Sequence, residues 1–234
     1  MTTQRSLRSV PLKILALLLI CLTLQLMFAS TQPKPQAQAH ALGVPPSTPL
    51  LRLISFGEPI ALAQMMTLYL QAFDNKPGIS IPFNNLDYPR VAVWLSRILE
   101  LDPHGQYPLM MASQLYSQVP DTAKQRYMLA FVYRAFLADP AHRWPWLAHA
   151  AIMAKHRLHD LPLALQYAQA IAKHAKGKDV PHWAQQMPIF ILEEMGEAES
   201  AKIMLVALLA NGTITDSHEI HFLTKRLETL KHGP

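Results

Sequence analysis

From residue 50 onward, apolar positions recur with the three-to-four-residue spacing of an amphipathic helix. Segments of helix length alternate with short breaks at Gly, Pro and Asp. Ile79-Ser80-Ile81 is the only strand-like fragment, and it is too short to define a sheet. The pattern therefore predicts an all-α body. The expected helices lie near 59–73, 88–101, 106–118, 121–138, 143–158, 160–175, 181–194, 197–210 and 215–231, with a shorter helical turn near 50–56.

The N-terminal region has a different pattern. Residues 14–29 are apolar at every position except Thr23 and Gln25, and a hydrophobic stretch of about 20 residues is reached between Val10 and Ser30. Such all-round apolarity predicts a transmembrane signal anchor over residues 1–30. The basic residues that precede it predict a cytoplasmic N-terminus. The localisation predicted is a single-pass inner-membrane protein whose C-terminal domain is periplasmic.

A cleaved signal peptide is the alternative interpretation of this segment. Ala37, Ala39 and Ala41 form a small-x-small pattern typical of a peptidase site, although it begins eight residues beyond the apolar stretch. The distance favours the uncleaved anchor. Residues 31–49 then form a Pro/Gln/Ala-rich linker, and residues 50–234 form the helical domain, with the charged last helix as its cap.

Similar phrases recur along the domain at a spacing of 37 residues. Asp102-Pro103 and Asp139-Pro140 each end a helix, and Trp146 and Trp183 are separated by the same interval. Ala164 also has its counterpart 37 residues later, in Ala201. The spacing indicates one helical hairpin per repeat.

These repeats resemble the tetratricopeptide (TPR) family. The phrase from Leu99 to Pro103 is similar to the end of the second TPR helix, and Met195 to Ala201 is similar to its hairpin turn. The resemblance covers about residues 88–212, with 75–86 as an insertion in the first hairpin. It implies a TPR-like right-handed solenoid of helical hairpins. The whole chain also resembles Gram-negative membrane proteins with one anchor and a TPR-like body, which implies no particular activity.

Charge argues against nucleic acid as a partner. The chain holds 21 Lys and Arg against 16 Asp and Glu, but four of these basic residues precede residue 42 and no acidic residue does. The remainder has 17 basic and 16 acidic residues, so the domain is almost neutral. Within it, residues 121–179 are locally basic and residues 193–199 are acidic.

No motif predicts catalysis. The sequence has no phosphate-binding loop, dinucleotide turn or nucleophile elbow. Its single cysteine, Cys21, lies in the apolar segment, so neither a disulfide nor a Cys-rich zinc site can form. We therefore predict that the protein is not an enzyme and carries no cofactor.

The eleven histidines do not predict a metal site either. His218-Glu219-Ile220-His221 lacks the four-residue spacing of the HExxH helix, and His156 and His159 beside Asp160 would bind an ion only weakly. His142, His149 and His156 recur every seven residues, about 10 Å apart along a helix axis, so they cannot share one ion.

The TPR resemblance implies that the first helix of each hairpin lines a concave groove. An extended peptide or a partner helix would bind there, while ordinary packing between repeats is the alternative role for the same side chains. Aligning the repeats through Ala164 and Ala201 places an aromatic and basic set beside an aromatic and acidic set. The candidates are Trp146, His149, Met153, His156 and Arg157 in one repeat, and Trp183, Gln186, Phe190, Glu193 and Glu194 in the next.

Three functional hypotheses follow. The first is a membrane-tethered scaffold that binds a protein or peptide at the periplasmic face of the inner membrane. The second is a chaperone-like subunit in cytochrome maturation or secretion, where tethered TPR modules also occur. The third is an envelope protein that binds metal through its histidines. The sequence favours the first and names neither the partner nor the oligomeric state.

Overall fold

The fold is described from a computed structural model, which covers residues 11–31, 41–73, 75–76, 79–177, 179–212 and 214–232, without the side chains of residues 75, 76, 79, 231 and 232. The chain divides into two compact units, residues 1–38 and 39–234. Each unit is described by itself. The expected peptidase pattern at Ala37 and Ala39 lies outside the described residues.

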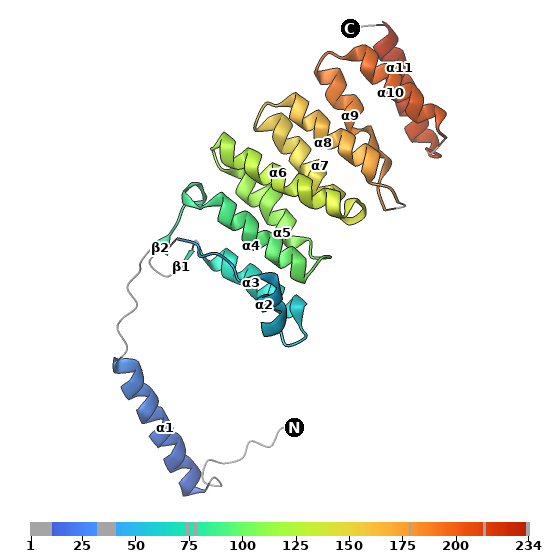
Figure 1. Cartoon of the computed structure of the whole chain (residues 1–234). Helices are drawn as coiled ribbons and strands as arrows, with labels where there is room; N and C mark the ends of the chain where they lie inside the picture. Colours follow the sequence, from blue (N-terminus) through green and yellow to red (C-terminus); the bar gives the residue numbers. More distant parts are fainter. Residues whose placement is uncertain are drawn as a thin grey trace. The chain divides into compact units, whose positions relative to one another are not determined.

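The first unit contains one helix, α1 (Leu12–Thr31), none of whose residues is buried (Figure 1). Its 20 residues span about 30 Å, the thickness of a bilayer's hydrocarbon core. The hydroxyls of Thr23, Ser30 and Thr31 each donate to a carbonyl of the same helix at 2.8 Å, so they need no water. This confirms a helix that is long and apolar enough to cross a membrane, although a signal sequence has the same features.

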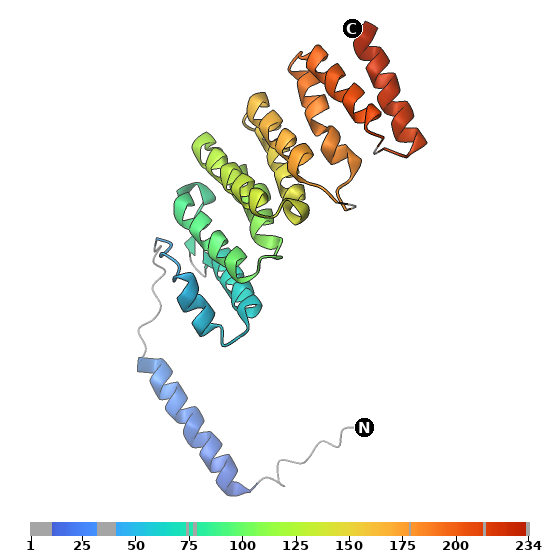
Figure 2. The same ribbon diagram turned by 45° about the vertical axis from the view of Figure 1, so that its right-hand side comes forward.

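The second unit is a row of helices that pack against one another largely in sequence order (Figures 1 and 2). This arrangement confirms the predicted helical, repeat-like body. The helices are α2 (Thr48–Ile54), α3 (Pro59–Phe73), α4 (Tyr88–Leu101), α5 (Tyr107–Met110), α6 (Thr122–Ala138), α7 (Pro140–His156), α8 (Leu161–His174), α9 (His182–Glu194), α10 (Ala198–Ala210) and α11 (Ser217–His232).

Short polar residues start several of these helices. The carboxylates of Asp121, Asp160 and Asp216 accept backbone N–H groups from the first turns of α6, α8 and α11, at 2.8 to 3.1 Å. Each bond satisfies a donor that has no partner within its helix. Pro59 occupies the first position of α3, where its missing N–H costs nothing. These starts were predictable because capping depends on local sequence alone.

The expected helix over 106–118 is interrupted. The α-helical part, α5, covers only four residues, and a π-helical turn at Met111–Leu115 and a 3-10 turn at Tyr116–Gln118 follow it. Pro120 forces Val119 into an extended conformation, which ends the helical path. The hydroxyl of Tyr88 donates to the Tyr116 carbonyl at 2.8 Å and fixes the last turn from outside.

Helix α7 is also displaced from the expected range of 143–158. It begins at Pro140, because proline is favourable in a first turn. It ends at His156, because the N–H groups of Arg157 and Leu158 both donate to the Met153 carbonyl and His159 then takes a left-handed conformation with φ 51°.

The segment between α3 and α4 contains the only strands among the described residues. Strand β1 (Asn75–Lys76) pairs with β2 (Ile79–Ser80) in an antiparallel register, with Asn75 opposite Ser80. Two residues per strand cannot form a layer of the fold. The pair therefore belongs to a local insertion in an otherwise helical unit.

The interior between α7 and α8 is formed largely by alanine. Ala148, Ala151 and Ala154 on α7 and Ala164 and Ala168 on α8 are each at most 3% exposed. We call these five residues the alanine seam. Side chains of one carbon allow two helix backbones to approach closely. The main core extends from Leu42 to Ile191, and a second cluster joins α9, α10 and α11.

Candidate functional site

Helical spacing places four of the expected groove residues along one side of α7. Trp146 is half-buried, and its Nε1 donates to Oε1 of Gln106 at 2.6 Å, so it joins α7 to the residue before α5. Met153 is buried, whereas His156 is exposed. His149 is half-buried, burial lowers its pKa, and its Nε2 is buried without a hydrogen-bond partner. His149 is therefore a neutral packing residue at pH 7.

The corresponding residues of α9 are largely engaged with α11. Gln186 is buried and donates through Nε2 to the carboxylate of Glu219. Arg226 lies 5.9 Å from the centre of the Phe190 ring and donates through Nε to Glu193 at 2.9 Å. In this structure these three α9 side chains attach the final helix. Their binding to a partner stays a prediction.

The remaining expected residues are accessible. Trp183 is 51% exposed and packs its edge against Trp144, with the ring centres 5.5 Å apart. Arg157 is exposed, and the carboxylate of Glu194 pairs with Lys155 of α7. Together with His156, these residues form the part of the expected groove that a partner could reach.

A small cavity of about 140 Å³ opens between α7 and α9. That volume suits a single side chain of a partner rather than a small-molecule ligand, which needs several hundred cubic ångströms. The expected residues His156 and Phe190 take part in its wall. The lining consists of Ala151, Ile152, Lys155, His156, Met187, Phe190 and Ile191.

A larger accessible surface lies on α2 and α3, where no site residue was expected. One side of α3 is buried through Ala63, Met66, Leu70 and Phe73, yet the other side is also apolar, and the helix has no charged residue. The exposed side chains are 47% to 93% accessible. We call this surface the N-terminal apolar face, and it consists of Leu50, Leu53, Phe56, Ile60, Met65 and Leu68.

A cavity of about 360 Å³ adjoins this face, between α3, the end of α4 and the start of α5. Leu68 belongs both to the cavity wall and to the N-terminal apolar face. The lining is mainly apolar, with a few polar groups at its edge. Its residues are Ala63, Gln64, Thr67, Leu68, Ile98, Asp102, Gly105, Tyr107 and Pro108.

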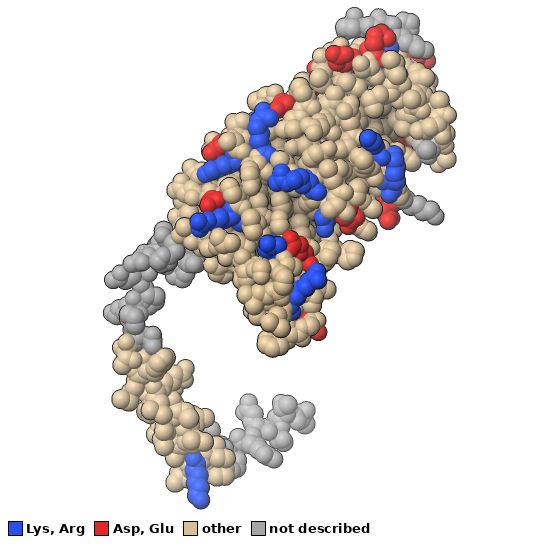
Figure 3. Space-filling model, in the orientation of Figure 1, with Lys and Arg blue, Asp and Glu red and all other residues tan. Residues whose placement is uncertain are grey.

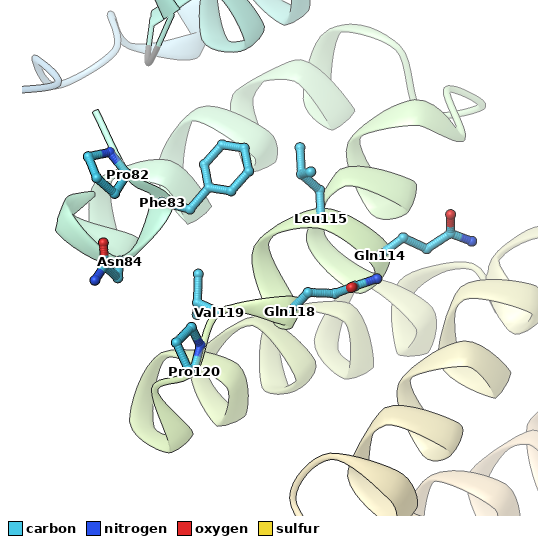
Figure 4. A pocket seen from close by; sticks show the side chains of 8 residues that line it. All are labelled: Pro82, Phe83, Asn84, Gln114, Leu115, Gln118, Val119 and Pro120. Carbon is cyan, nitrogen blue, oxygen red and sulfur yellow. The ribbon is translucent and has the colours of Figure 1, made fainter. Parts of the chain in front are cut away.

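The cavity shown in Figure 4 has a volume of about 450 Å³ and lies between the insertion before α4 and the interrupted helix after α5. Phe83, Leu115 and Val119 supply apolar walls, and three side-chain amides lie around them. No ionisable side chain lines it, so it offers no acid, base or nucleophile. The complete lining is Pro82, Phe83, Asn84, Gln114, Leu115, Gln118, Val119 and Pro120.

The N-terminal apolar face had a signal in the sequence. Apolar residues lie on both sides of α3, which has no charged residue and only a few polar ones, a pattern that is typical of a buried helix. At the N-terminal end of a row of repeats, such a helix has no preceding repeat to bury its outer side. Position and composition together would therefore have indicated an exposed apolar surface.

Comparisons with known proteins add no assignment to this geometry. No protein-family model, no curated protein and no solved structure matches the chain.

Proposed function

We propose that the protein is a membrane-tethered, TPR-like scaffold that binds a protein partner at the periplasmic face of the inner membrane. In this proposal α1 is an uncleaved anchor, oriented by the basic residues before it. Support comes from the apolar length of α1 and from the row of helical hairpins with a 37-residue spacing. Repeat proteins of this architecture commonly provide extended binding surfaces.

The N-terminal apolar face is the observation that carries the proposal. Leu53 of α2 is 73% exposed, Met65 and Leu68 of α3 are 66% and 63% exposed, and Phe56 in the turn between the two helices is 93% exposed. Large apolar patches on the surface of a soluble domain mark interaction sites, and these residues are candidates for one. The terminal repeats of solenoids normally present a polar outer surface. The N-terminal end of the helical unit is therefore suited to bind an apolar surface of another molecule.

The chemistry of the face favours a protein helix over the bilayer as its occupant. Helices that lie on membranes carry many basic residues, whereas α3 has none and α2 has only Arg52. The two helices are bent by 110° and their buried sides pack on α4. The adjoining cavity could also receive a side chain that anchors a partner helix laid along α3.

The scaffold proposal is tested by placing a photo-reactive amino acid at Leu68 in cells. We expect a discrete cross-link to one protein, whose purified form then binds the full chain in nanodiscs. Leu53→Asp with Leu68→Asp should weaken that binding at least tenfold, or about 1.4 kcal/mol. Ile203→Asp with Val206→Asp is the matched control, because these α10 residues are also apolar and exposed, at 69% and 50%.

Three outcomes would contradict the proposed docking face. Equal loss of binding in both double variants would indicate a nonspecific effect of added charge. A fluorophore at position 68 that is quenched by spin-labelled lipid in the nanodisc would place the face on the bilayer. Loss of binding in Trp183→Ala alone would instead assign docking to the surface between α7 and α9.

The topology is tested separately by fusing alkaline phosphatase after Pro234. The enzyme is active only in an oxidising compartment, so we expect an active fusion. An inactive fusion with a stable product would place the helical unit in the cytoplasm and reject the periplasmic part of the proposal.

A further inference from the structure

Two histidines and one aspartate meet where successive helix connections lie side by side. His104 is in the turn between α4 and α5, Asp139 joins α6 to α7, and His142 is in the first turn of α7. Their potential ligand atoms all lie within 4.8 Å of one another. The two imidazole centres are 5.7 Å apart, and His142 Nδ1 is 2.9 Å from an Asp139 carboxylate oxygen.

We propose that His104, Asp139 and His142 form a binding site for a divalent transition-metal ion such as zinc. Imidazole nitrogen and carboxylate oxygen are both ordinary zinc ligands, at roughly 2.0 to 2.2 Å from the ion. In tetrahedral coordination two such ligand atoms are about 3.4 Å apart, so no pair has to close by more than roughly 1.4 Å. Both imidazoles are exposed at the surface and can rotate to close that gap.

The repeat itself creates the juxtaposition. Asp102-Pro103-His104 ends α4, and Asp139-Pro140-Ala141-His142 follows α6, 37 residues further along the chain. Equivalent turns of successive repeats become neighbours when the hairpins stack. The next equivalent position, 176–179, has no histidine, so the repeat provides a single such site here.

Hydrogen bonds hold the His104 turn in place. Gln106 Nε2 donates to the His104 carbonyl at 3.1 Å, and Gln106 Oε1 accepts from Trp146 at 2.6 Å. The buried Arg143 donates to the Pro103 carbonyl and to the Ala135 carbonyl, each at 2.9 Å. These bonds fix the backbone on both sides of the cluster. Fixed neighbours reduce the cost of ordering ligands around an ion.

Local charge also suits a cation. Asp139 and the nearby Asp102 outnumber Arg143, whose two Nη atoms are already used by carbonyls. Partial burial acts to raise the pKa of Asp139, but the hydrogen bond from His142 and the charges of His142 and Arg143 lower it overall. The carboxylate is therefore ionised at neutral pH. Its two oxygens lie 2.9 and 3.1 Å from His142 Nδ1, so an ion bound here would replace that contact.

The structure does not bring together His156, His159 and Asp160, the possible metal ligands that the sequence placed side by side. Asp160, expected beside His156 and His159, instead pairs with Arg126 at 2.6 Å and caps α8. Among the described residues, the His104 cluster is the only group of three potential ligands close enough to share an ion. The proposal replaces our expectation that the histidines form no metal site. Three protein ligands would hold the ion, and water would occupy the fourth position of a tetrahedral site.

The test is a zinc titration of the full chain in detergent, purified with a tag that contains no histidine and freed of metal with a chelator. Calorimetry at pH 7.5 should detect one equivalent of zinc. His104→Ala with His142→Ala should remove this equivalent. Asp139→Asn, which retains shape, should weaken it about tenfold or more. His156→Ala with His159→Ala is the matched control and should bind like the parent chain.

Far-ultraviolet circular dichroism checks that each variant keeps its helices, which we expect because the altered imidazoles are exposed. The proposal is rejected if the parent chain binds no zinc below about 100 µM, or if the His104/His142 variant keeps the equivalent. Loss of the equivalent in the His156/His159 variant would assign it to those residues and equally reject the site. If the double variant is unfolded, Asp139→Asn alone decides, and unchanged affinity there overturns the proposal.

Discussion

The two ends of the helical unit differ in what they leave exposed. Helix α11 buries Leu223 and carries several charged residues, and two of these, Glu219 and Arg226, bond to α9. Helix α3 is equally well packed on one side but has no charge at all on the other. In the space-filling view, acidic groups lie at the C-terminal end and also beside the Lys and Arg groups over the middle of the unit (Figure 3).

The C-terminal end of the row is thus covered by a charged helix, whereas the outer helix at the N-terminal end is uncharged. A charged outer helix stops further stacking, because a second hairpin would have to bury its charges. An uncharged outer helix imposes no such cost. The N-terminal end is therefore the end at which another helix can continue the row, as the proposed function requires.

The comparison is tested most strongly by truncating one leucine at each end. Leu223→Ala should lower the free energy of unfolding by about 3 kcal/mol, because it removes buried apolar atoms and leaves a cavity. Leu68→Ala should change it by less than about 0.5 kcal/mol, because that side chain is 63% exposed. Urea unfolding of the full chain in detergent measures both. Equal losses would show that Leu68 is packed within the protein.

A smaller effect is expected from the ion pair that attaches the cap. Arg226 donates through Nε to Glu193 at 2.9 and 3.1 Å, and this hydrogen bond raises the pKa of the guanidinium. Arg226→Met leaves a largely buried carboxylate without its donor and should cost about 1 to 2 kcal/mol. Lys202→Met is the control, because its partner Glu199 is 82% exposed and such pairs contribute little. A loss in the control as large as that in Arg226→Met would contradict this account.

The smallest effect concerns the polar contact that holds the opposite end. Thr48, the first residue of α2, donates to Glu100. Arg97 donates to both residues, at 2.8 Å to the Thr48 hydroxyl and at 2.8 Å to Oε2 of Glu100. Partial burial acts to raise the pKa of Glu100, but the hydrogen bonds from Thr48 and Arg97 and the charge of Arg97 lower it overall. The contact therefore stabilises the fold above the carboxyl's ordinary pKa of 4.5 and is lost as pH falls through the lowered value.

Between pH 7 and pH 3 the loss of this contact should lower the free energy of unfolding by at most about 0.5 kcal/mol, because both side chains are partly exposed. Glu100→Gln should remove that part of the pH dependence. Glu58→Gln, at the same end, should leave it unchanged, since the bonds among Thr48, Arg97 and Glu100 stay intact. An unaltered profile in Glu100→Gln would show that the contact contributes nothing to stability.

Much of the fold could be predicted from the sequence because its determinants are local. Helical periodicity and capping aspartates located most helix boundaries to within a few residues, as at Asp121 and Asp160. The interrupted end of the helix after α5 was not predictable, because its last turn is bonded at the Tyr116 carbonyl by Tyr88 from another helix. Contacts between distant segments override a local pattern.

The candidate sites were harder to predict for the same reason. The spacing of Trp146 and Trp183 indicated that α7 and α9 hold equivalent places in successive repeats. It did not indicate that α11 would cover Gln186 and Glu193. The His104 cluster combines residues 35 and 38 positions apart, so no compact motif announces it. The repeated Asp-Pro turns were visible in the sequence, and only stacking brings their histidines together.

The alanine seam has a mechanical consequence. Leucine or methionine side chains can change rotamer and let two helices slide, whereas a methyl group has no such freedom. Closely packed backbones of this kind resist compression and transmit strain. The contact between α7 and α8 should thus resist sliding of the two helices. We therefore expect a displacement imposed at the N-terminal apolar face to be transmitted through α7 and α8 rather than absorbed between them.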